Sequence, residues 1–278
     1  RTTLVGNRQA PRDVDPSPAL CGRWQKTAAG AAMLSILTTG EVMAAQKTNM
    51  PGTELDEVLN RLTDRDIPAA VGFDARMRTL ISIASLTAAG DTQVLRKIVA
   101  DGIQNGINPL EMREAIVQTM AYSGLPTALA AQDVLAQELA KAGKEFPTQK
   151  SATVSDADRF EKGLAAQKRI FGPAIDAMHK NAKADERALT VDLLTGYCFG
   201  DTYTRTGLTL KEREFLTFVV ISSIGGCEPQ VKAHAAGNIA MGTTRKELID
   251  AIVVMLPFIG FPKSLNALAM VNEAAPAD

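Results

Sequence analysis

The chain has very few of the residues that hold metal ions or crosslink small secreted domains. Its 278 residues include two histidines and three cysteines. The cysteines, Cys21, Cys198 and Cys227, show no spacing typical of a zinc site, and their odd number argues against a disulfide framework. We therefore expect no metal site.

Aromatic residues and clustered positive charge are also scarce. Aromatics make up 5% of the chain, whereas Ala, Leu, Ile, Met and Val are plentiful, which favours a helical core. The net charge is −1, and no Lys/Arg cluster alternates with aromatic residues as in a nucleic-acid-binding surface. A content of 46% hydrophobic and 22% charged residues is ordinary for a soluble globular protein. We expect a small-molecule ligand, and neither nucleic acid nor membrane as partner.

The N-terminal residues 1–45 differ in composition from the rest of the chain. A basic stretch at 23–26 precedes an apolar run over 28–37, and small residues follow at 42–45. This order is typical of a secretory signal peptide, and the run is too short to span a bilayer as a stable helix. The pattern predicts a leader and a periplasmic or secreted protein. If the leader is not a signal, the expected location is cytoplasmic.

Two segments of the chain are copies of one sequence. Residues 90–131 and 226–267 align without a gap at an offset of 136 and are identical at twelve of forty-two positions. The identities include residues that set backbone geometry: Gly90 and Gly226, Gly106 and Gly242, Gly124 and Gly260, and Pro126 and Pro262, with Glu111 and Glu247 between them. The pattern predicts a duplicated fold.

Helical signals recur through both copies. Helix caps followed by apolar residues at helical spacing predict helices over 53–62, 74–89, 92–105, 109–123, 127–141 and 211–224. Helical patterns also cover 156–182, with a break at 171–173, and 189–197, which a predicted loop over 200–207 follows. We expect an all-α fold with a first repeat over 53–140, a polar linker over 141–155 and a second repeat over 156–275.

The copies differ where chemistry could occur. The second copy has Cys227, Gln230 and His234 at the positions where the first has Asp91, Val94 and Ile98. The first repeat is therefore expected to have a degenerate site, and the second repeat to hold the candidate active site.

Cys227 is predicted at the start of a helix, where unpaired N–H groups and the helix dipole favour a thiolate. His234 follows two turns later on the same expected face, with Gln230 between them as a candidate substrate-binding residue. A histidine there can act as a base if a third group orients it, and Glu214 from the preceding helix is the candidate. Each residue also has a structural interpretation, because a cysteine near a helix start is often a small buried hydrophobe and a helical histidine is often a core residue.

Three other residues are candidates for the functional site, but their sequence neighbours give them less support. Arg205 could hold an anionic ligand or brace its own loop, and Cys198 and His179 are expected to be structural.

The two units resemble the carboxymuconolactone decarboxylase family, here in tandem over nearly everything after residue 53. The resemblance rests on a glycine turn, an amphipathic helix, a Glu-x-x-[Glu/Asp]-Ala-Ile segment and an aromatic-x-Gly-x-Pro segment in each copy. The stretch from Phe199 to Arg213 is similar to the decarboxylase branch, which converts a carboxylated muconolactone to an enol-lactone and carbon dioxide without a cofactor. The resemblance implies that Arg205 and Arg213 bind a substrate carboxylate. It also implies a homo-oligomer, a trimer or a multiple of one.

A second branch of the family offers a different chemistry. The series Glu214, Cys227, Gln230 and His234 resembles the alkylhydroperoxidase D motif, Glu…Cys-x-x-Cys-x-x-x-His, with Gln230 in place of the second cysteine. An internal disulfide shuttle is thereby excluded within the motif, and a peroxidase using Cys227 would need an external thiol. Three functions therefore remain open: a cofactor-independent decarboxylase-like enzyme, a thiol peroxidase, and a non-catalytic small-molecule binder.

Overall fold

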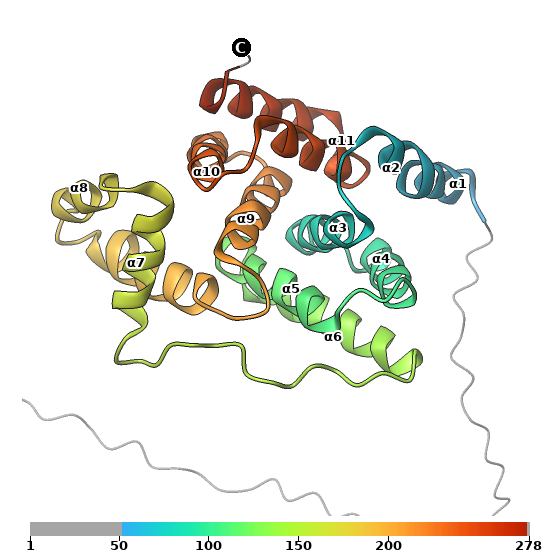
Figure 1. Ribbon diagram of the computed structural model, residues 1–278, viewed down its shortest axis with the longest axis horizontal. Helices are drawn as coiled ribbons and strands as arrows, with labels where there is room; N and C mark the ends of the chain where they lie inside the picture. The colour runs from blue at the N-terminus through green and yellow to red at the C-terminus, as the bar shows by residue number, and fades with distance from the viewer. Residues whose placement is uncertain (1–51, 277–278) are drawn as a thin grey trace, which may run out of the picture. The chain divides into compact units, whose positions relative to one another are not determined.

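The computed structural model describes residues 52–276, which belong to one compact unit (Figure 1). The predicted leader, residues 1–45, lies outside the described residues. The described chain is mainly helical and contains no strand, which confirms the all-α prediction. Its elements are α1 (Glu54–Arg61), η1 (Leu62–Asp66), α2 (Ile67–Ala70), α3 (Ala75–Ala89), α4 (Thr92–Gln104), α5 (Pro109–Ser123), α6 (Leu125–Lys141), α7 (Arg159–Phe171), α8 (Ala174–Asn181), η2 (Ala188–Tyr203), α9 (Leu210–Ile224), α10 (Glu228–Ala240) and α11 (Arg245–Ala274), where η denotes a π-helix.

The helices begin where the sequence supplies caps. Thr53, Thr209 and Thr244 each close a capping box with an acid three residues later, and Asp74 accepts a hydrogen bond from the Met77 N–H at the start of α3. These caps satisfy backbone N–H groups that have no partner inside the helix. Gly90 ends α3 in the left-handed region, at φ 73°, which a residue with a side chain adopts at a cost.

The core is centred on α3 and α9, the equivalent helices of the two repeats (Figure 1). The middle of both helices is buried, from Leu80 to Thr87 in α3 and from Arg213 to Ser223 in α9. This explains why the apolar run at 74–89 is too long and too continuous for a surface helix. Helices α4, α5 and α6 surround α3, while α10 and α11 pack on α9.

The two repeats exchange contacts. Helix α5 of the first repeat packs against α9, and α11 of the second repeat packs against α3. Gln118 donates from Nε2 to Thr217 Oγ1 over 3.1 Å, and Ser223 Oγ lies 2.8 Å from Ser85 Oγ. Each repeat therefore covers part of the central helix of the other repeat, α3 or α9. A site on α9 for this reason also includes residues of α5.

The predicted loop over 200–207 is wrong in its first half, because η2 continues to Tyr203. Gly200, the first residue of the predicted loop, instead provides space where η2 crosses α7. A Cβ on Gly200 would collide with the Arg159 carbonyl oxygen, and a Cβ on Gly163 would collide with the Thr195 carbonyl oxygen. The glycines allow two backbones to approach closely.

Helix α11 is long and apolar enough by length and composition to cross a membrane, which among the described residues holds for this helix alone. Gly260, at φ 73° and ψ 170°, interrupts its helical backbone near the middle. Each piece on either side is shorter than the roughly 20 residues that a spanning helix needs. Several residues of both pieces, including Leu248, Met255 and Val271, are buried in the core, as expected for a core helix that turns a corner.

The predicted linker is held against the helices. Arg113 of α5 donates from Nη1 to the Gln149 carbonyl oxygen over 3.1 Å and from Nη2 to Ser151 Oγ over 2.6 Å. The Thr206 N–H donates to the Ser151 carbonyl oxygen over 2.9 Å. Side chains of the first repeat thus fix the path of the chain into the second.

Candidate functional site

A buried carboxylate and an imidazole form the centre of the candidate site. Glu214 of α9 places Oε1 2.8 Å from Nδ1 of His234 on α10. The Glu214 side chain is fully buried and that of His234 is 11% exposed. A carboxylate that accepts a hydrogen bond from the Nδ1–H group orients the imidazole ring. Nε2 is then left to exchange a proton with another molecule. The structure therefore brings together two of the three residues that the sequence suggested for catalysis.

Aromatic rings enclose the imidazole. Phe171 at the end of α7 and Tyr122 at the end of α5 meet His234 edge to face, with ring centroids 5.2 and 5.9 Å from that of the imidazole. The Tyr203 hydroxyl donates to Glu214 Oε2 over 3.1 Å and lies 2.7 Å from the hydroxyl of Tyr122. Both oxygens of the Glu214 carboxylate thus have partners, and the surroundings are largely shielded from water.

The hydroxyl and thiol groups around Glu214 are held protonated. Burial raises the pKa values of Tyr122 and Tyr203 well above their usual value, and the nearby Cys198 thiol and Glu214 carboxylate add to the shift. Burial likewise raises the pKa of Cys198 to about 12, partly offset by a bond with Tyr122. At neutral pH these groups can donate hydrogen bonds but carry no charge.

Cys227 lies apart from this cluster. It is the N-cap residue of α10, and its Sγ donates to the Ile221 carbonyl oxygen over 3.1 Å. Burial, followed by the charge of Glu228, raises the pKa of its thiol, although a backbone N–H and the charge of Lys263 act in the opposite sense. The expectation that the helix start would activate the thiol is therefore wrong in direction, because desolvation outweighs the favourable groups.

The backbone at Cys227 does not support the predicted shared helix face with His234. The expected shared face assumed helical backbone at both residues, but Cys227 has φ −134° and ψ 42°, outside the helix. Seven residues along a helix also correspond to a rise of about 10 Å. Gln230, predicted to contact substrate, is exposed to solvent. No hydrogen bond joins Cys227 to His234 in the described part of the chain.

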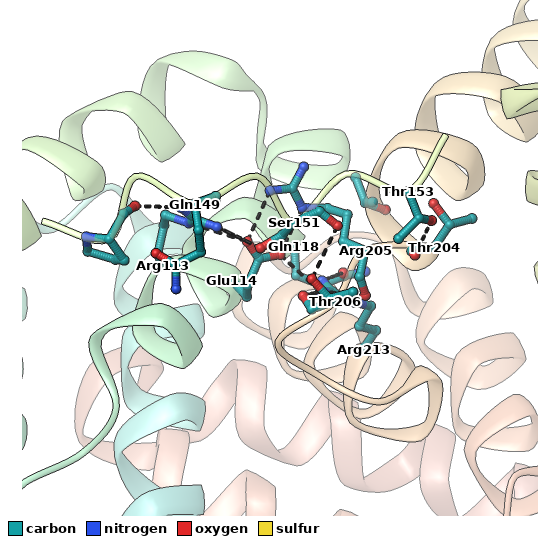
Figure 2. Close-up of polar contacts among 12 residues, drawn as sticks. Arg113, Glu114, Gln118, Gln149, Ser151, Thr153, Thr204, Arg205, Thr206 and Arg213 are labelled. Atoms are coloured by element: carbon teal, nitrogen blue, oxygen red, sulfur yellow. Dashed lines mark hydrogen bonds and ion pairs between the residues drawn. The ribbon is translucent and has the colours of Figure 1, made fainter. Parts of the chain in front are cut away.

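The arginines suggested by the resemblance are engaged with a carboxylate of the first repeat (Figure 2). Glu114 of α5 accepts from Arg205 Nε over 2.8 Å and from Arg213 Nη2 over 2.9 Å. The Arg213 side chain is fully buried, and its remaining donors contact Gln118 and the carbonyl oxygens of residues 205 and 206. Arg205 is 16% exposed, and Nη1 is the guanidinium nitrogen it does not use on Glu114. Of the two, Arg205 is therefore the one able to reach another anion.

Glu114 remains ionised in this network. Burial raises the pKa of its carboxyl, but the hydrogen bonds and charges of Arg205 and Arg213 outweigh burial and lower the pKa to about 2. Arg113, the neighbour of Glu114 on α5, places Nη2 2.9 Å from Glu114 Oε1. Figure 2 shows Glu114 between Arg113 on one side and Arg205 and Arg213 on the other.

Several residues of the site were not found from the sequence: Glu114, Gln118, Tyr122, Phe171, Tyr203, Thr217 and Asn238. Asn238 donates from Nδ2 to the Glu214 carbonyl oxygen over 3.1 Å and links α9 to α10. Tyr122 could have been suspected, because its aromatic-x-Gly-x-Pro segment is repeated in the second copy. The other side chains carried no pattern that distinguishes them from ordinary helical residues.

The described residues contain no group of three or more His, Cys, Asp or Glu side chains arranged to hold a metal ion. Among those residues, Cys198 and Cys227 are free thiols. The chemistry that the arrangement offers is acid–base chemistry at His234.

Comparison with known proteins agrees with the duplicated architecture. The family model for the carboxymuconolactone decarboxylase family matches residues 53–137 and again residues 188–273. A 15.0-kDa protein from the nqo9–nqo10 intergenic region of Paracoccus denitrificans is 34% identical over 109 residues, which are 38% of this chain and 79% of that protein. The 4-carboxymuconolactone decarboxylase of Acinetobacter baylyi is 22% identical over 120 residues, 43% of this chain and 89% of that enzyme.

Each relative thus matches less than half of this chain while the match covers most of its own length, as expected if a relative corresponds to one repeat. The two matched regions together cover more than half of the chain; the first runs from α1 into α6 and the second from η2 into α11. The chain therefore belongs to the carboxymuconolactone decarboxylase family, as a tandem duplication of its helical unit.

Proposed function

We propose that the protein is a cofactor-independent decarboxylase-like enzyme that acts on a small carboxylated lactone, with His234 as its acid–base residue. The observation that carries the proposal is the 2.8 Å contact between His234 Nδ1 and Glu214 Oε1 in a site enclosed by aromatic rings. The name of the Acinetobacter baylyi relative supports the substrate class.

The chemistry requires one proton transfer for each carbon dioxide released. Breaking the bond between the ring carbon and the carboxylate leaves an electron pair that the lactone carbonyl can delocalise. A proton must then reach carbon, and protonated His234 can deliver it from Nε2 while Glu214 stabilises the charged ring. The protonated Tyr203 hydroxyl donates to the Glu214 carboxylate and is itself paired with the protonated Tyr122 hydroxyl. Neither tyrosine adds a second negative charge. Arg205, with Nη1 available, is the proposed partner of the substrate carboxylate.

The alternative thiol peroxidase has less support. Its nucleophile would be Cys227, whose thiol pKa is raised and which makes no hydrogen bond with His234 among the described residues. Cys198 is buried with a pKa of about 12, so it is a poor resolving thiol.

Turnover by matched variants separates these functions. The full chain is assayed with 4-carboxymuconolactone and, separately, with a hydroperoxide and an external thiol. We expect His234→Ala to lower lactone turnover about a hundred- to ten-thousand-fold and Cys227→Ser to leave it nearly unchanged. His179→Ala, which removes the other histidine of the sequence, is the control and should retain activity. Hydroperoxide turnover that Cys227→Ser abolishes would overturn the proposal in favour of the peroxidase. Absence of both activities would favour a binding protein.

We also propose that the protein assembles as a homo-oligomer. Large apolar side chains are exposed at equivalent places in the two repeats: Leu125 and Leu129 on α6, and Phe261 and Leu265 on α11. Light scattering of the purified chain should give a mass that is a multiple of 29.6 kDa. Phe261→Ser combined with Leu265→Ser should lower that mass if the α11 pair lies in the interface. A monomer at high micromolar concentration would contradict the proposal.

A further inference from the structure

The first repeat contains an open cavity at the position equivalent to the His234 site. The cavity has a volume of about 320 Å³ and lies between η1, α2, α3 and α4 of the first repeat and α11 of the second. Its lining includes Arg78, Thr79, Ile98, Val254 and Phe258. A volume of this size accommodates a small organic molecule.

The correspondence between the two sites follows from the repeat. The N-caps Asp74 and Thr209 place α3 and α9 in register at an offset of 135, and the extra glycine after α9 changes the offset to 136. The paired positions are Arg78 with Arg213, Thr79 with Glu214, Ile98 with His234, and Phe258 with Tyr122. The first repeat therefore lacks the acid–base pair at this position.

The cavity is open because smaller side chains stand at two of the equivalent positions, Pro68 in place of Tyr203 and Thr79 in place of Glu214. At the same offset of 135, Thr63 and Pro68 line the cavity where the second repeat has Cys198 and Tyr203. Cys198 and Tyr203 are buried and fill the corresponding space beside Glu214. The exchange of the tyrosine for a proline and of the glutamate for a threonine leaves room for a ligand.

The equivalent arginines differ in their partners. Asp250 occupies the position of Glu114, but its Oδ2 lies 2.6 Å from Lys246 Nζ and accepts from the Gly72 N–H over 3.1 Å. The aspartate is one methylene shorter than the glutamate, and within residues 52–276 it forms no ion pair with Arg78. Arg78 donates from Nη1 to the Phe73 carbonyl oxygen, and its Nε and Nη2 make no protein hydrogen bond among these residues. Arg78 of the cavity lining therefore has two guanidinium nitrogens, Nε and Nη2, that make no hydrogen bond with the described residues.

Two acids also line the cavity, and pairing with a lysine or exposure to solvent weakens the effect of each on an anion beside Arg78. The Asp101 carboxylate lies 2.6 Å from Lys97 Nζ, which compensates its charge. Asp64 is exposed to solvent and accepts from Thr63 Oγ1 over 2.7 Å.

We propose that the first-repeat cavity binds a small organic carboxylate. Nε and Nη2 of Arg78 hold the carboxylate as a paired donor, the geometry that a guanidinium offers to such groups. The apolar body of the ligand lies against Ile98, Val254 and Phe258. This site is separate from the proposed acid–base site, and the first repeat contributes binding where the second contributes chemistry.

Calorimetric titration with benzoate tests the proposal, with the neutral analogue benzamide as comparison. The full chain should bind benzoate at least about tenfold more tightly than benzamide. Arg78→Gln should reduce benzoate affinity about tenfold or more and leave benzamide affinity unchanged. Arg187→Gln, which removes an exposed arginine beside η2, is the matched control and should bind benzoate as the parent does.

Two further variants keep the test decisive. Thr63→Phe adds a large side chain to the cavity lining and should weaken the binding of both benzoate and benzamide. This variant tests whether the ligands bind in the cavity even if Arg78→Gln fails to fold. His234→Ala should bind benzoate normally, because the proposed sites are separate. Equal affinity for benzoate and benzamide, benzoate binding that survives Arg78→Gln and Thr63→Phe, or loss of binding in His234→Ala would each overturn the proposal. None of these results depends on lactone turnover, so this proposal and the proposed function can fail independently.

Discussion

The two repeats place the same helices around two very different environments. In the second repeat, Arg213 is fully buried and neutralised by Glu114, and the adjacent Glu214 is covered by His234 and its aromatic neighbours. In the first repeat, Arg78 lines a cavity and pairs with no carboxylate in the described part of the chain. The comparison indicates that a few side-chain exchanges on a duplicated scaffold distinguish a packed polar cluster from an open pocket whose arginine has no carboxylate partner among the described residues.

The largest expected effect concerns the carboxylate that distinguishes the two environments. Glu214→Gln removes the charge that orients and stabilises the His234 ring, so lactone turnover should fall about a hundred- to ten-thousand-fold. Steady-state kinetics across pH checks this expectation. The pH profile of turnover should also change, which a purely structural role of Glu214 would not cause. Glu273→Gln, which changes an exposed acid of α11, should retain full activity. Unchanged turnover in Glu214→Gln would remove Glu214 from the mechanism.

The equivalent arginines should differ in their effect on stability. Arg213→Leu leaves the buried Glu114 with one fewer partner and should lower the free energy of unfolding by roughly 3–5 kcal/mol. Arg78→Leu removes one hydrogen bond to a carbonyl oxygen and should cost about 1 kcal/mol. Urea denaturation of both variants at pH 7 measures the difference. Equal losses would show that the ion network around Glu114 does not distinguish the repeats.

Acid should weaken the second-repeat network. The pKa of Glu114 is lowered to about 2 in the folded protein, below the ordinary value of 4.5. Its contribution to stability is therefore complete above pH 4.5 and is lost as the pH falls toward 2. Urea denaturation at a series of pH values should show a shallower loss of stability in Glu114→Gln than in the parent. Parallel curves for the two proteins would assign the acid sensitivity to other groups.

The smallest expected effect is on thiol reactivity. Iodoacetamide should label Cys227 slowly at neutral pH, because its thiol pKa is raised, and Cys198 only on unfolding, because its pKa is about 12. Mass spectrometry of a Cys21→Ser variant, which leaves these two thiols, follows each site separately. Rapid labelling of Cys227 at pH 7 would point to a thiolate and revive the peroxidase alternative.

Much of the fold could be predicted because its signals are local. Thr53, Asp74 and Asn108 cap the helices that their neighbours form, and Gly90 ends α3 as expected. The pairing of His234 with Glu214 was also foreseen, since both lie on adjacent helices of one repeat. The end of η2 was missed because Gly200 serves a close crossing with α7, and a packing contact leaves no local pattern.

The sequence alone determined the duplicated helical unit and the repeat that holds the histidine, because caps, apolar spacing and internal identity are properties of neighbouring residues. The tertiary structure decided which groups meet. It brought Tyr122 and Glu114 from the first repeat to the second and engaged Arg213 with a buried carboxylate. These outcomes depend on packing between segments about a hundred residues apart, where burial and charge compensation set the chemistry of each side chain.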